Sequence, residues 1–354
     1  MSESIEAASV EVIRRGRRRR VRRRRTVVVC LVAVLAALFL TSLCVGHTVY
    51  SPYDALRVVL GETVPGASFT VGRLRLPRAL TGALAGFAFG LAGATFQTLL
   101  RNMLASPDVI GITSGASAAA VFAIIVLGLG GTAVFVVAVP AGVLVALVIY
   151  LLTYRQGVLG ARLVLVGIGV GALLNSVTSY LLLRAPAWDV QEAMRWLTGS
   201  LSSAFWDGVG PLAAGVVPLS AVLLALERPL TALQLGDDSA RALGTRVETV
   251  RLALVLGAVG LTALATAATG PIAFVAFLSG PVAQRLTGGN GSPLLPAALT
   301  GAVLVLAADL VGQFAFDTRF PVGVVTGALG APCLLWLLAR PGRTRLARRA
   351  EGVL

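Results

Sequence analysis

Long runs without a charged residue alternate with short charged segments along most of the chain. A helix needs about 20 apolar residues to cross a bilayer, because its backbone groups must be hydrogen-bonded within the segment. The runs long enough for one crossing are 26–53, 79–100, 163–183, 208–226, 286–308 and 320–339. This pattern predicts an all-α integral membrane protein.

Two further runs each predict a pair of helices. Residues 109–154 are about twice the minimum length for one crossing. They are interrupted by Gly128, Gly130 and Gly131, which favours a helical hairpin. Residues 252–284 carry Gly270 and Pro271 in the middle, where one helix should end and another begin. The expected total is about ten transmembrane helices.

Composition agrees with this class, and charge predicts the orientation. The chain is 56% hydrophobic and 13% charged, with a mean hydropathy of +0.87. Its net charge of +14 is concentrated at the ends, with ten of the 30 basic residues in 14–25 and five in 340–349, so a nucleic-acid-binding surface is not indicated. The positive-inside rule places both termini in the cytoplasm, which requires an even number of crossings. We expect basic cytoplasmic tails at 1–25 and 341–354 around a ten-helix domain at 26–340.

The start of the chain has an alternative interpretation. An arginine cluster before an apolar run also resembles a signal peptide. Residues 26–45 are long enough to span, and no clear cleavage site follows them. A retained first helix is therefore favoured.

Three segments between the predicted crossings are not spans. Residues 52–61 and 190–205, on the outer side, favour short interfacial helices, with headgroup anchors at Trp188, Trp196 and Trp206. Residues 227–251 form the longest inner loop, which predicts two short helices. The second is expected at 239–243, capped by Asp237 and Asp238 and closed by Gly244.

The residue inventory excludes several kinds of chemistry. A phosphate-binding P-loop needs a lysine, and the chain contains none. With the single histidine His47, a histidine-based zinc site and a Ser-His-Asp triad both lack parts. We therefore expect neither an enzyme nor a metal site. If the chain transports a solute against a gradient, a partner protein or an ion gradient must supply the energy.

Polar positions inside the predicted spans are few. Asp309 is nearly the only intramembrane acid, and it is either an ion-relay group or a packing carboxylate. Gly171, Asn175 and Ser179 recur every four residues, which indicates either a hydrophilic path or helix packing through small residues. The candidate path residues are Gln97, Gly171, Asn175, Ser176 and Ser179.

Several motifs are specific enough to compare with known families. They are residues 75–78, the glycines at 82, 86, 90 and 93 with Gln97, and residues 101–111, 165–169, 196–200, 235–244, 270–275, 308–309 and 321–327. These motifs resemble those of the FecCD family of ABC-importer permeases, which import iron-siderophore complexes, heme or vitamin B12. The resemblance covers nearly the whole chain from about residue 30. It implies a type II ABC-importer permease fold in the cytoplasmic membrane, with ten helices per subunit.

The resemblance also implies partners and residue roles. The partners are a second permease, either a paralogue or a second copy, two cytoplasmic P-loop ATPases that hold ATP and magnesium, and an external binding protein. No cofactor is expected in this chain. The inner loop at 227–251 would couple to the ATPase through Leu235, Gly236, Asp237, Asp238, Ala240, Leu243 and Gly244. A solvated, well-capped loop is the simpler alternative.

External arginines are the expected docking residues. Arg75 and Arg78 match family positions that face acids on the binding protein, although they could instead extend to lipid headgroups. Gln313 stands where many members carry Arg, and Arg319 where Glu is common. We hypothesise that docking has moved to Arg319. Met103 in place of Pro, and Val282 after Gly280 and Pro281 in place of His or Gln, are further departures.

The cargo is the least constrained expectation. Residues 165–171 and 196–200, with Gln313, most resemble the ferric-enterobactin or catecholate-siderophore branch. Heme or a corrinoid is the alternative cargo within the family. An ion-coupled secondary carrier is the alternative from another class.

Overall fold

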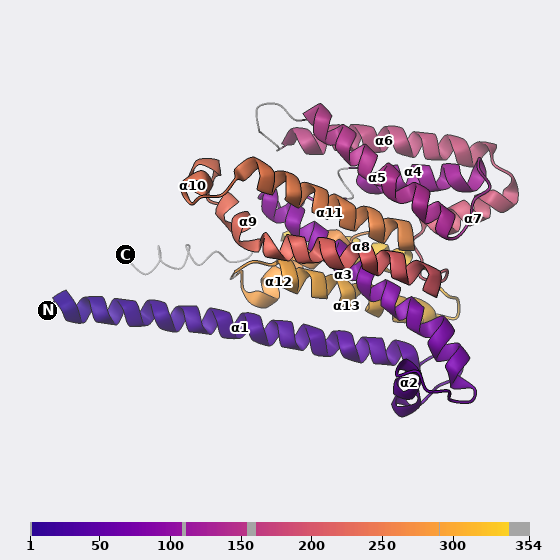
Figure 1. The fold of residues 1–354 in the computed structure, drawn as a ribbon, viewed down its shortest axis with the longest axis horizontal. Coiled ribbons are helices and arrows are strands. Elements are labelled where there is room, and N and C mark those ends of the chain that lie inside the picture. The colour runs from indigo at the N-terminus through magenta and orange to yellow at the C-terminus, as the bar shows by residue number, and fades with distance from the viewer. Residues whose placement is uncertain (1, 108–110, 154–160, 290, 340–354) are drawn as a thin grey trace.

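The computed structural model describes residues 2–107, 111–153, 161–289 and 291–339, and in these ranges all regular structure is helical (Figure 1). The 341–354 tail lies outside them. The elements are α1 (Ser2–Cys44), α2 (Pro52–Val59), the π-helix η1 (Ser68–Arg75), α3 (Leu76–Leu99), α4 (Ile112–Ile125), α5 (Thr132–Thr153), α6 (Ala161–Arg184), α7 (Ala187–Leu197), α8 (Trp206–Ala225), α9 (Glu227–Leu233), α10 (Asp237–Ala242), α11 (Val247–Thr269), α12 (Val275–Thr287), α13 (Leu294–Phe314) and α14 (Val322–Ala339).

Every predicted crossing has a helix, and both predicted breaks are confirmed. The glycine segment separates α4 from α5, and Gly270 lies in the left-handed region between α11 and α12. Seven helices in the described ranges are long and apolar enough to cross a membrane, and α4 and α14 are shorter apolar helices. The remaining helix of the ten predicted to cross, α12, has 13 residues. At 1.5 Å per residue it covers about 20 Å of a ~30 Å hydrocarbon core. Ten crossings therefore stays a prediction.

Two predicted boundaries are wrong. The predicted tail at 1–25 is helical and continuous with the first span in α1, because arginine favours helix and nothing in the segment ends it. The run at 286–308 begins too early, because Gly288 and Gly289 have positive φ and α13 starts only at Leu294. The segment at 190–205 is helical only to Leu197, where Gly199, at φ 68°, turns the chain.

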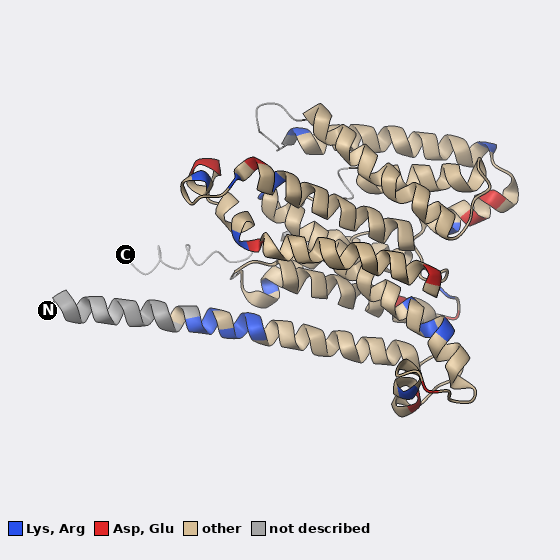
Figure 2. Cartoon of the chain, viewed as in Figure 1, with Lys and Arg blue, Asp and Glu red and all other residues tan. Residues whose placement is uncertain are grey.

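Charged residues gather at the two ends of the molecule, with an uncharged belt between them (Figure 2). One end, called here the basic end, carries the arginines of α1 with α9, α10 and the last turn of α12. The opposite end carries α2, α7 and the first turn of α8. This distribution is what a bilayer requires, because charge is costly in hydrocarbon. By the positive-inside rule, the basic end is the one expected to face the cytoplasm.

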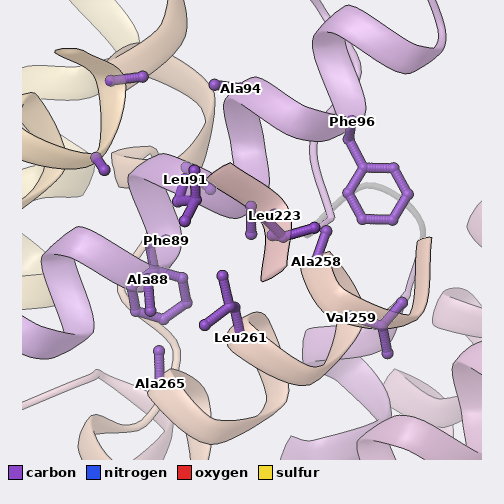
Figure 3. Packing of buried hydrophobic residues seen from close by; sticks show 14 of the residues in the cluster. Ala88, Phe89, Leu91, Ala94, Phe96, Leu223, Ala258, Val259, Leu261 and Ala265 are labelled. Atoms are coloured by element: carbon purple, nitrogen blue, oxygen red, sulfur yellow. The ribbon is translucent and has the colours of Figure 1, made fainter. Parts of the chain in front are cut away.

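The core is built around α3, which packs against α11, α12 and α13. Gly86 and Gly90 face the backbone of α13 at Gly301 and Ala297, where a side chain would collide with main-chain atoms. Such close approach of backbones is how helices associate in lipid, where apolar burial gives little driving force. Phe89 and Leu91 of α3 lie with Leu223 of α8 and Leu261 of α11 in the largest buried apolar cluster (Figure 3), so α3 is the fixed centre of the fold.

Candidate functional site

The predicted coupling residues lie on α10 and its flanks, at the basic end (Figure 1). Ala240 is fully buried and holds α10 against the body, whereas Leu235 and Leu243 on either side of it are each 66% exposed. Gly236 and Gly244 have positive φ, and the Gly244 amide donates to the Arg241 carbonyl, so Gly244 closes the helix as predicted. Leu235 and Leu243 are therefore accessible to a partner protein.

The predicted capping of α10 is wrong. The helix begins at Asp237 itself, and its N-cap is Gly236, which has no side chain. Arg251 Nη2 donates to both carboxylate oxygens of Asp237, at 2.8 and 2.9 Å, and ties α10 to the first turns of α11. Asp238 has a fully exposed side chain, which Arg241 approaches at 3.1 Å from within the same helix. Asp238 is therefore the aspartate that remains accessible to a partner.

Two further arginines, which the sequence analysis did not select, hold α9. Arg24 of α1 pairs with Glu227 at 2.7 Å, at the start of α9. Arg101, after α3, donates to the Leu233 carbonyl at 2.6 Å, at the end of α9. The predicted coupling loop is thus attached at both ends of α9, to α1 through Arg24 and to the segment after α3 through Arg101.

The predicted docking role of Arg75 is not supported. Its guanidinium donates to the carbonyls of Leu43, Cys44 and Thr48 at 2.7 to 3.0 Å and lies over the Tyr50 ring. Arginine is well suited to close a helix C-terminus in this way, since the last carbonyls of α1 have no partner within the helix. Arg75 therefore fixes the α1–α2 turn.

Arg78 also has an internal partner, which resolves the role of Asp309. Its Nε and Nη2 donate to the two carboxylate oxygens of Asp309 at 3.0 and 2.7 Å, and Gln313 Nε2 donates to the same carboxylate at 2.7 Å. The Asp309 side chain is only 5% exposed. The Asp309 carboxylate accepts hydrogen bonds from both Arg78 and Gln313, and its pair with Arg78 joins α3 to α13. This arrangement favours the packing interpretation over an ion relay.

Arg319 differs from the other two docking candidates. It is exposed, lies in the loop between α13 and α14, and contacts His47 Nε2 in the α1–α2 turn. Arg73 on η1 is a second exposed arginine at this end, and the sequence analysis did not select it. Arg319 and Arg73 are thus accessible positive charges at this end, as are Arg184 and Arg195.

Gln97 does not share a surface with the other predicted path residues. It is 4% exposed, and its Nε2 donates to the Phe277 carbonyl of α12 at 2.9 Å. Pro281 has no N–H for that carbonyl, so Gln97 supplies the donor that the α12 backbone lacks. Gly280 leaves room for it, since a side chain there would collide with the Gln97 amide oxygen. In this structure Gln97 stabilises the bent half-helix α12.

The α6 residues separate into two groups. Gly171 is buried against Gly111 and Ser114 of α4, as the packing interpretation predicts. Asn175, Ser176 and Ser179 of α6 are exposed. The two serine hydroxyls donate to the carbonyls four residues earlier, at 3.0 Å each. An exposed Asn175 on a spanning helix favours a polar neighbour over lipid, because an unpaired amide is costly in hydrocarbon.

Two cavities lie away from α6, and no described residue of α6 lines either of them. One, of about 630 Å³, lies at the end opposite the basic end and is lined in part by Asp189, Glu192, Arg195 and Asp207. The other, of about 600 Å³, is mostly apolar and lies at the α11–α12 break, with Pro271, Phe274 and Gly323 in its wall. The face around α7 is therefore partly acidic, and the sequence analysis did not foresee this.

Comparison with known proteins identifies the chain. The model of the FecCD transport family matches residues 34–340. The chain belongs to the FecCD transport family. It is 38% identical over 322 residues to the ferric enterobactin transport system permease protein FepG of Escherichia coli (strain K12), covering 88% of this chain and 98% of that protein. It is 40% identical over 314 residues to the achromobactin transport system permease protein CbrC of Dickeya dadantii (strain 3937), covering 88% and 90%.

A solved structure supports the fold of this FecCD permease. The structure, described as an inward-facing conformation of a metal-chelate type ABC transporter, superposes with a TM-score of 0.80 at 25% identity. The match covers 89% of this chain and 99% of that one. The FecCD permease is thus a multi-pass membrane protein and an ABC-transporter permease subunit, not itself an enzyme.

Proposed function

We propose that this FecCD permease carries ferric siderophore across the cytoplasmic membrane, and that the siderophore is of the catecholate type. The observation that carries the proposal is the similarity to FepG, which spans nearly all of that protein. No group of three or more His, Cys, Asp or Glu in the described ranges could hold a metal.

The proposed mechanism needs three partners. A binding protein releases the chelate at the face opposite the basic end, and two ATPase subunits with ATP and magnesium engage α9 and α10. A second permease, which we propose is a paralogue, covers the outer face of α6, so that Asn175, Ser176 and Ser179 line the path between subunits. Hydroxyl and amide groups offer weak hydrogen bonds, from which a hydrophilic chelate can also leave. Both termini lie in the cytoplasm in this scheme.

The test is reconstitution of the permease with the proposed ATPase, second permease and binding protein. Proteoliposomes should take up ferric catecholates in an ATP-dependent way, faster than heme or a corrinoid, and a protonophore should not stop them. Faster uptake of heme or cobalamin would show that this compound, and not a ferric catecholate, is the cargo. Uptake by this chain alone, without ATP and abolished by a protonophore, would instead identify an ion-coupled carrier.

Charge reversal at Arg319 tests the docking proposal. Arg319→Glu is expected to weaken binding-protein affinity roughly five- to tenfold and to reduce its salt dependence, because exposed charges steer and orient encounter. Affinity is measured by surface plasmon resonance at two salt concentrations, with the permease in nanodiscs.

Arg319→Lys, which keeps the charge, is the matched control and should bind nearly as the original chain does. Arg75→Glu should instead disturb the α1–α2 turn and lower stability, because Arg75 is committed to backbone carbonyls. Unchanged affinity and salt dependence in Arg319→Glu would remove Arg319 from the docking surface.

A further inference from the structure

The arginine-rich turns of α1 continue without a break into its apolar part. Seven described arginines, at positions 18, 19, 20, 22, 23, 24 and 25, stand immediately before Thr26. The family match begins only at residue 34, so family membership does not account for this segment.

Two of the arginines fix how α1 is rotated about its axis. Arg23 Nε donates to the Leu286 carbonyl at 3.0 Å, and its Nη2 donates to the Arg285 carbonyl at 3.2 Å, in the last turn of α12. Arg24 pairs with Glu227 at 2.7 Å. These contacts turn the side of α1 that carries Arg23 and Arg24 toward the protein.

Three other arginines therefore point away from the protein. Arg18, Arg22 and Arg25 are spaced i, i+4 and i+7, which at 3.6 residues per turn places them within about 60° of one another, opposite Arg23 and Arg24. All three are exposed, and none has an ion-pair partner among the residues that the structure describes. We call Arg18, Arg22 and Arg25 the arginine stripe.

The arginine stripe lies where lipid headgroups are expected. Arg25 directly precedes the apolar run, and the stripe extends about 10 Å along the axis from Arg18 to Arg25, comparable to the polar layer of one leaflet. Figure 2 shows the arginines of α1 at the same end as the charged parts of α9, α10 and α12, just beyond the uncharged belt. A peripheral helix at this depth presents its outer side to lipid.

We propose that the arginine stripe is a binding surface for anionic phospholipid headgroups. The guanidinium fork matches phosphate oxygens, and basic residues beside a span are attracted to anionic leaflets. An acidic surface of the ATPase is the competing occupant. It fits less well, because α9, where the ATPase is proposed to dock, lies on the opposite side of α1, at Arg24.

The test uses the full chain in nanodiscs that contain equal amounts of phosphatidylglycerol and phosphatidylcholine. Native mass spectrometry measures the ratio of the two lipids retained after release. The triple variant R18Q/R22Q/R25Q should lose its preference for phosphatidylglycerol, by roughly fivefold per arginine removed. The triple lysine variant R18K/R22K/R25K should keep most of that preference.

A matched control removes the same charge elsewhere at the basic end. R228Q/R241Q/R246Q neutralises three exposed arginines of the coupling loop and should retain lipid as the original chain does. An unchanged ratio in the glutamine stripe variant, or an equal loss in this control or in the lysine variant, would overturn the proposal. The measurement needs neither ATP nor cargo, so its outcome is independent of the proposed transport function.

Discussion

Replacing Asp309 with asparagine is expected to lower the free energy of unfolding by about 3 kcal/mol, because the Arg78 charge is left without its partner between α3 and α13. This loss is at the low end of the range expected when one partner of a buried ion pair is removed, because the Arg78 side chain is 25% exposed. Unfolding is followed by titration with sodium dodecyl sulfate, using tryptophan fluorescence. Asparagine keeps one acceptor oxygen in place of two for the donors of Arg78 and Gln313, which adds to the effect.

A double substitution separates a structural pair from a functional carboxylate. Asp309→Leu with Arg78→Met removes both charges, so it should recover most of the stability that Asp309→Asn loses. The exposed pair Arg57–Glu62, at 2.6 Å, is the matched control, and Glu62→Gln should leave the unfolding curve unchanged. If Asp309→Asn is as stable as the original chain but abolishes transport, the ion-relay interpretation of Asp309 returns.

The number and order of the apolar helices can be predicted from the sequence. Charge-free runs and the breaks at Gly128 and Gly270 predict them, since a bilayer accepts only long apolar helices with internally bonded backbones. Boundaries are less well predicted. Two consecutive glycines with positive φ end α12, and a run of uncharged residues does not reveal them.

Residue roles that depend on distant partners could not be predicted. Arg78 and Asp309 are 231 positions apart, and Arg75 binds carbonyls of a helix that ends 31 positions earlier. A pattern that suggests an external arginine cannot show that its guanidinium is already occupied. Gln97 illustrates the same limit. Its partner is a carbonyl made available by Pro281, and only the fold brings the two together.

Replacing Leu235 and Leu243 with aspartate is expected to lower ATP-driven uptake more than tenfold while leaving the permease folded. Both side chains are 66% exposed, so their loss should change stability little. Two exposed leucines inserted in a groove of the ATPase would act as anchors, and buried carboxylates there would be unpaired. Uptake and ATP hydrolysis are measured on the same proteoliposomes, and co-purification reports whether the ATPase stays bound.

The matched controls distinguish anchoring from transmission. Leu235→Met with Leu243→Met keeps the apolar contact and should transport nearly normally. Arg101→Gln leaves the leucines in place but removes the bond to the Leu233 carbonyl that ties α9 to the end of α3. It should keep the ATPase bound and hydrolysing while uptake falls, because force on α10 no longer reaches α3 efficiently. Normal uptake in the double aspartate variant would show that this loop is merely solvated, and the site of attachment would have to lie elsewhere at the basic end.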